Sequence, residues 1–174
     1  MTSLDQSSWR KRAGNRVSRA VPATGTALVG ALLWAMAMGA SALTGLWLDN
    51  WETPEKIRFV ALLFATGAAL AFPVGLFAAR LVSLDRHWEV AFAAAFVCLL
   101  ATTLAFTGGL FALQYRSYYA EWHAEAFTAR WAFELVFTSL TALYQFVVLG
   151  IRLYFPLGFI ALAAASVWFA RRQR

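Results

Sequence analysis

The sequence predicts an all-α integral membrane protein: a bundle of four transmembrane helices with an amphipathic, aromatic-rich helix on the outer side before the last span. Three observations predict this fold class. The 174-residue chain is 61% hydrophobic and only 14% charged, whereas soluble domains are about half apolar and a quarter charged. Its apolar residues fall in runs long enough for a helix to cross about 30 Å of hydrocarbon. Its basic residues gather beside those runs.

The apolar runs divide the chain into three parts. We expect a basic N-terminal segment, a transmembrane helical domain and a basic tail, at 1–24, 25–170 and 171–174. Within the domain, spans are expected at 25–48, 57–79, 89–113 and 148–170, and the interfacial helix at 118–147. A cleaved signal peptide is the alternative for the first run, because Ala40-Ser41-Ala42 resembles a cleavage site. The long basic segment before that run and the spans after it favour a retained helix.

The number of spans depends on the region before the last one. Residues 131–151 are apolar enough to cross the membrane, and five spans are therefore the alternative. A fifth crossing would place Arg171, Arg172 and Arg174 outside and would require a reversal in very few residues. We therefore interpret 118–147 as lying at or partly in the outer interface, followed by a final span kinked near Gly150 and Pro156.

Orientation follows from the basic residues. If the N-terminus is cytoplasmic, ten of the fifteen lysines and arginines lie inside and five outside, as the positive-inside rule requires. Both termini are therefore expected in the cytoplasm, and in a bacterium the protein would lie in the inner membrane. The N-terminal cations either set this topology alone or also contact anionic lipid; they are Arg10, Lys11, Arg12, Arg16 and Arg19.

A stripe of polar side chains marks the region before the last span. Helical spacing brings six of them near one face: Arg130, Glu134, Thr138, Thr141, Gln145 and Arg152. A polar stripe on an apolar helix must face water, headgroups or protein. We interpret it as a headgroup-facing side; a surface that contacts a partner or lines a cavity is the alternative, and a catalytic role ranks last.

Two further patterns suggest contact surfaces. Aromatic residues on the outer side predict an interface belt or a docking surface for a membrane partner, with Tyr118, Tyr119, Trp122 and Trp131 as candidates. Small residues recur at every fourth position in the first two runs, a spacing that lets helices approach closely in lipid. The candidates for such packing, within the chain or with a partner, are Ser41, Gly45, Gly67, Ala71 and Gly75.

No pattern in the sequence indicates an enzyme, a cofactor or a metal site. Serine-nucleophile motifs, phosphate loops and zinc-protease motifs are missing from it, and one cysteine, Cys98, allows no internal disulfide. Glu121 and Glu125 would share a helix face, but His123 would point elsewhere, so this cluster predicts no metal centre. The formal charge of +6 reflects membrane topology better than nucleic-acid binding. The expected partners are the lipid bilayer and a membrane protein.

In layout, and in the final Pro156, Gly158 and Phe159, the chain resembles the small membrane subunits of tripartite periplasmic (TRAP) transporters. Trp51-Glu52 echoes the tryptophan–acidic stretch that such subunits carry after their first span. This resemblance implies a small membrane subunit of a multi-component solute transporter, which we keep as the alternative. The residues themselves favour a non-enzymatic accessory or scaffold subunit of a larger membrane complex, because the first three runs carry no ionisable residue in their central stretches.

Overall fold

The computed structural model describes residues 14–50 and 53–173 and is helical throughout, with no strand in these ranges. A short helix over residues 14–20 precedes the main elements. The helices are α2 (Thr24–Asp49), α3 (Pro54–Ser83), α4 (Trp88–Tyr119), α5 (Ala129–Gln145) and α6 (Leu157–Arg172). Three short turns join them: η1 (Ala120–Trp122), the π-helical η2 (Phe146–Gly150) and the 3₁₀-helical η3 (Ile151–Tyr154).

The predicted fold class is confirmed. Four helical segments are long and apolar enough to span a membrane, namely Thr24–Asp49, Pro54–Ser83, Trp88–Trp122 and Ala129–Tyr154. The chain is therefore an integral membrane protein whose helices contact lipid. The last helix, α6, has 16 residues and rises about 24 Å, less than the hydrocarbon core of about 30 Å.

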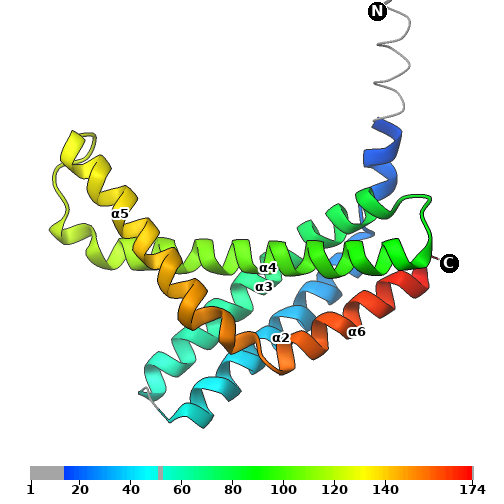
Figure 1. The fold of residues 1–174 in the computed structure, drawn as a ribbon, viewed down its shortest axis with the longest axis horizontal. Helices are drawn as coiled ribbons and strands as arrows, with labels where there is room; N and C mark the ends of the chain where they lie inside the picture. Colours follow the sequence, from blue (N-terminus) through cyan, green and yellow to red (C-terminus); the bar gives the residue numbers. More distant parts are fainter. Residues whose placement is uncertain (1–13, 51–52, 174) are drawn as a thin grey trace, which may run out of the picture.

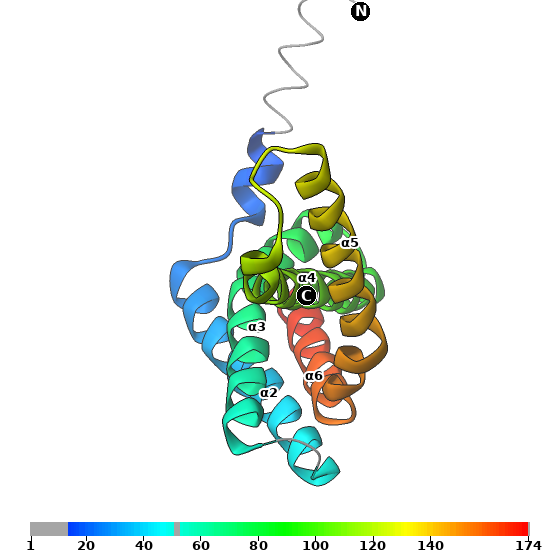
Figure 2. The ribbon, with the colours of Figure 1, turned by 90° about the vertical axis from the view of Figure 1, so that its left-hand side faces the viewer.

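Helix α3 packs against α2 and α4, and α6 packs against α4 and α2, so that these four helices form a closed bundle (Figure 2). The buried core contains aromatic and aliphatic side chains from all of these helices, including Trp34, Phe64, Leu99 and Phe169. Close approach depends on glycine where α3 meets α4, because a Cβ built at Gly67 would lie 2.5 Å from the Thr107 hydroxyl oxygen.

Two predicted helix boundaries are wrong. The helix expected over 118–147 is two helices, because α4 runs to Tyr119 and the chain reverses between η1 and α5. Phe127 has a left-handed φ of 69° in this reversal, and the Thr128 hydroxyl caps α5 by accepting a hydrogen bond from the Trp131 N–H at 3.1 Å. The continuous span expected over 148–170 is interrupted at Phe155–Pro156, where proline supplies no N–H and the chain is extended before α6 begins. The kink predicted near Gly150 and Pro156 is present there.

One end of the bundle, which we call the basic end, gathers the helix over 14–20, the α3–α4 connection and the last residues of α6 (Figure 1). Arg19 pairs with Asp85 of that connection at 3.1 Å, and Arg80 donates a hydrogen bond to the Val21 carbonyl at 3.2 Å. At the opposite end α2 leads into α3. The described parts of the two termini therefore lie on the same side of the bundle.

Helix α5 runs across the direction of α2 and α3 instead of alongside them (Figure 1). Its last turns meet the bundle at the opposite end, where Arg152 of η3 pairs with Asp49 of α2 at 3.4 Å. The C-terminal part of α4, η1, the connection after it and α5 form a helical hairpin that projects from the bundle. We call residues 115–145 the arm.

Candidate functional site

The carboxylate of Glu134 joins α5 to the connection that precedes it. One oxygen accepts a hydrogen bond from the backbone N–H of Ala124 at 2.7 Å, and the other accepts one from Nε of Arg130 at 2.9 Å. Arg130 and Glu134, one helical turn apart, therefore form an ion pair, and the same carboxylate also holds the connection that precedes α5. Hydrogen bonds to an ionised carboxylate are stronger than those to a neutral acceptor. These bonds therefore hold the connection against the first turns of α5.

His123 contacts α5 across the turn of the arm. Its Nε2 lies 3.2 Å from the hydroxyl oxygen of Thr138, which also donates a hydrogen bond to the Glu134 carbonyl. On a continuous helix over 118–147, His123 would fall on the same side as the stripe but about 22 Å from Thr138 along the axis. The reversal after η1 instead folds His123 back onto α5. Helical spacing does not predict this contact, because it joins residues on opposite sides of a turn.

The outer aromatic candidates form a ladder along the end of α4. The ring centroids of Tyr115 and Tyr119 are 4.8 Å apart, and those of Tyr118 and Trp122 are 5.7 Å apart. Trp131 lies across the hairpin on α5, where the guanidinium of Arg116 is 5.8 Å from its ring centroid. Tyr118 and Trp122 remain about two-thirds exposed, so this surface is largely uncovered by the rest of the chain.

The predicted polar stripe divides into two groups. Arg130, Glu134 and Thr138 lie in the arm's internal network, as described above, and Thr141 is exposed. Gln145 and Arg152 instead line a cavity of about 350 Å³ between α3, α4 and the η2–η3 segment. The stripe therefore forms no continuous polar path along the described helices.

The small residues predicted to pack helices face the interior of the bundle. The Ser41 hydroxyl donates to the Leu153 carbonyl at 2.8 Å and accepts from the Gly158 N–H at 3.2 Å, which ties α2 to the start of α6. A Cβ at Gly45 would lie 3.4 Å from Leu153. Three further members of the set, on α3, lie in buried positions: Gly67, Ala71 and Gly75.

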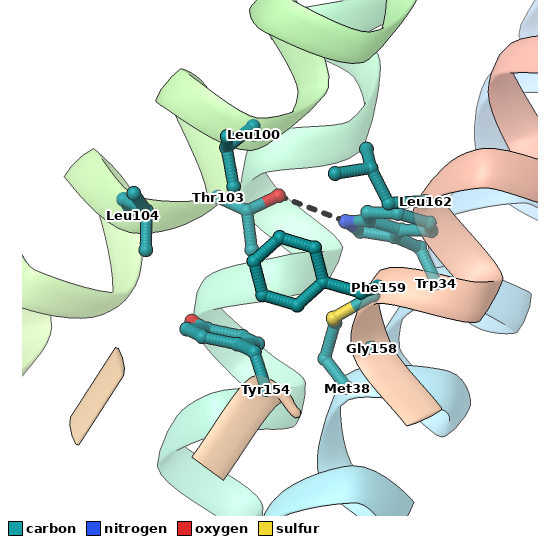
Figure 3. Close-up of a pocket in the computed structure, with 9 residues that line it drawn as sticks. All are labelled: Trp34, Met38, Leu100, Thr103, Leu104, Tyr154, Gly158, Phe159 and Leu162. Atoms are coloured by element: carbon teal, nitrogen blue, oxygen red, sulfur yellow. Dashed lines mark hydrogen bonds between the residues drawn. The ribbon is translucent and has the colours of Figure 1, made fainter. Parts of the chain in front are cut away.

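The pocket in the centre of the bundle is packing space and not a ligand site. Its volume is about 20 Å³, which is room for a water molecule and little more. Figure 3 shows the Phe159 ring between Tyr154 and Trp34, whose Nε1 donates to the Thr103 hydroxyl at 3.0 Å. Of the transporter-like motif, Gly158 is buried, whereas Phe159 lines this pocket but stays 38% exposed.

The N-terminal lipid candidates are only partly visible. Arg10, Lys11 and Arg12 lie outside the described residues. Arg16 is exposed, and Arg19 is held by Asp85 at the basic end. Arg19 thus joins the N-terminal helix to the α3–α4 connection.

No family model, curated protein or solved structure matches this chain.

Proposed function

We propose that this protein is a non-enzymatic accessory or scaffold subunit of a larger membrane complex, and that the arm is its partner-binding element. The observation that carries the proposal is a contrast within the arm. Its connecting segment is joined to α5 by hydrogen bonds through Glu134 and Thr138, yet Ala142 is the only buried residue of α5. A well-ordered element that covers so little of its own chain is suited to contact another one.

The exposed side chains of α5 support a protein partner in preference to lipid alone. Its uncovered face includes Phe133, Phe137 and Tyr144, each about two-thirds exposed, and it adjoins the aromatic ladder of α4. The uncovered face of α2 is aliphatic over most of its length, with Leu28, Leu32 and Met36, and it exposes Trp47 only near its end. Helix α5 instead combines its exposed aromatic residues with the aliphatic Val136 and Leu140. Aromatic residues are enriched at protein interfaces and dominate binding energy there, whereas aliphatic side chains suit the acyl chains of lipid.

The orientation proposed from the sequence fits the same picture. Arg16, Arg80 and Arg171 belong to segments that meet at the basic end, which we assign to the cytoplasm. The arm then lies toward the outer side of the membrane, and the membrane is the inner one if the organism is bacterial.

A role as a small subunit of a TRAP-like solute transporter is the second candidate, and the geometry favours it less. Gly158 and Phe159 have packing roles that explain their presence without any transporter, and Trp51 and Glu52 lie outside the described residues. The separation of Arg130 and Arg152 into different environments also removes the polar path that a transport role would use.

Site-specific photo-crosslinking tests the proposal. A photoreactive phenylalanine analogue replaces Phe137 on α5 or, as the matched control, Leu32 on α2, since both side chains are 64% exposed. We expect one discrete protein adduct from position 137 and only lipid adducts from position 32. The adduct protein should co-purify with the unmodified chain in mild detergent and be lost from the Phe133→Ala, Phe137→Ala double variant. Lipid adducts alone from both positions, together with a monodisperse lone chain, would contradict the proposal.

A further inference from the structure

The cavity between α3, α4 and the η2–η3 segment has the shape and chemistry of an amphiphile site. Its volume of about 350 Å³ falls in the range of ligand pockets. The walls are apolar and largely aromatic, with Phe59, Val60, Phe111 and Leu149 among them. The Phe146 ring forms part of the wall and lies 6.2 Å, centroid to centroid, from both Phe64 and Phe111.

The backbone around the cavity is built to hold Phe146 in place. A Cβ at Gly150 would lie 2.6 Å from this ring, and one at Gly108 would lie 3.0 Å from it. Phe146 begins the π-helical turn η2, and such turns occur frequently at functional sites. Gly108 and Gly150 thus leave room for the Phe146 ring, and the π-helical turn sets where this ring lies in the cavity wall.

The polar residues of the lining lie together at the end where α2 leads into α3. They are Lys56, Gln114, Gln145 and Arg152, which supply two cations and two amides. Arg152 also pairs with Asp49, but the pair is long at 3.4 Å and about half-exposed, and such a pair is weak. A guanidinium has five N–H donors, so Arg152 is able to bind an anionic group beside Asp49.

We propose that this cavity binds an anionic phospholipid, with an acyl chain against Phe146 and the phosphate-bearing headgroup at Lys56 and Arg152. The site is distinct from the basic end and from the arm's aromatic surface. A groove of similar volume, about 360 Å³, lies between α2, α3 and α6, but no charged residue lines it. The two cavities thus differ in charge and not in size, which makes the second one an internal control.

Native mass spectrometry of the full chain in detergent tests the headgroup. The probes are phosphatidylglycerol and phosphatidylcholine with identical acyl chains, and glycerol 3-phosphate as a headgroup without chains. We expect phosphatidylglycerol to bind more tightly than phosphatidylcholine and glycerol 3-phosphate not to bind. Equal affinity for the two lipids, or binding of glycerol 3-phosphate, would overturn the proposal.

Substitutions of Asp49 and Arg152 are expected to change the affinity for phosphatidylglycerol in opposite directions. Arg152→Gln should weaken phosphatidylglycerol binding about fivefold, and Asp49→Asn should strengthen it because a repelling charge is removed. A purely structural role of the pair would make both variants change affinity in the same direction, which would refute a headgroup site. Arg58→Gln is the matched control, since it removes one cation from the same turn of α3 as Lys56 without altering the lining.

A filling variant tests the acyl-chain site. Val60→Phe places a larger side chain in this cavity, and Ala165→Phe does the same in the uncharged groove. We expect only Val60→Phe to lower phosphatidylglycerol binding, with the helical content of both variants matching that of the unmodified chain by circular dichroism. Retained binding in a folded Val60→Phe variant would overturn the acyl-chain assignment.

Discussion

Replacing Gly67 by alanine tests the close approach of α3 to the backbone of α4. The new Cβ would lie 2.5 Å from the hydroxyl oxygen of Thr107 and 2.8 Å from its Cα. The hydroxyl can rotate away, but the Cα belongs to the backbone of α4, so the two helices must separate by several tenths of an ångström. Because α3 shares extensive interfaces with both α2 and α4, this displacement disturbs the centre of the fold.

The magnitude follows from comparison with Gly109, a glycine of α4 whose added Cβ meets nothing within 4 Å. Both alanine variants gain about 1 kcal/mol in helix propensity, so this contribution cancels between them. What remains is the cost of overpacking, about 1–3 kcal/mol. We therefore expect Gly67→Ala to be less stable than Gly109→Ala by that amount.

Unfolding by sodium dodecyl sulfate in mixed micelles, followed by tryptophan fluorescence, measures this difference. The midpoints of the two variants and of the unmodified chain give the free energies of unfolding in one series. If Gly67→Ala proved as stable as Gly109→Ala, the close approach of α3 and α4 at Thr107 would be refuted.

Three further variants test contacts elsewhere in the structure. Ser41→Ala should cost about 1–3 kcal/mol in that unfolding assay because two buried partners, the Leu153 carbonyl and the Gly158 N–H, lose their hydrogen bond. Ser117→Ala is the control, since this exposed hydroxyl bonds only to Leu113 of its own helix, and equal losses in both would contradict the reasoning. Glu134→Ala should speed hydrogen exchange at the Ala124 amide, whereas Glu121→Ala should not; unchanged exchange would exclude Glu134 as the acceptor that holds the arm. Arg19→Gln should change the free energy of unfolding by less than about 1 kcal/mol, because its pair with Asp85 is exposed, and a larger loss would show that this pair anchors the N-terminal segment.

Much of the bundle is predictable from the sequence because an uncharged apolar run determines a membrane helix directly. The runs at 25–48, 57–79 and 89–113 each lie within a single helix of the structure. The extension of α4 to Tyr119 is not visible in hydropathy, since its last turns are polar and aromatic. Gly150 and Pro156 located the kink before α6 because both residues carry a local backbone signal.

The turn within the arm carried no such signal. Residues 123–128 contain neither glycine nor proline, and the left-handed position is occupied by Phe127, a bulky residue that rarely adopts it. The contacts of His123 and of the Ala124 N–H depend on this turn, so the sequence does not predict them either. Five members of the polar stripe lie on α5, whereas Arg152 lies beyond it in η3, and the division of the stripe between the arm and the cavity is a tertiary effect.

The crosswise course of α5 carries this helix away from the common direction of α2 and α3 (Figure 1). A helix of 17 residues is about 25 Å long and about 10 Å wide, and α5 joins the bundle at the end opposite the basic one. With the orientation proposed above and with α5 along the outer interface, this helix would add about 250 Å² to the cross-section of the outer leaflet. Such a wedge would fit best where that leaflet is convex, so membrane curvature would then influence where the protein accumulates.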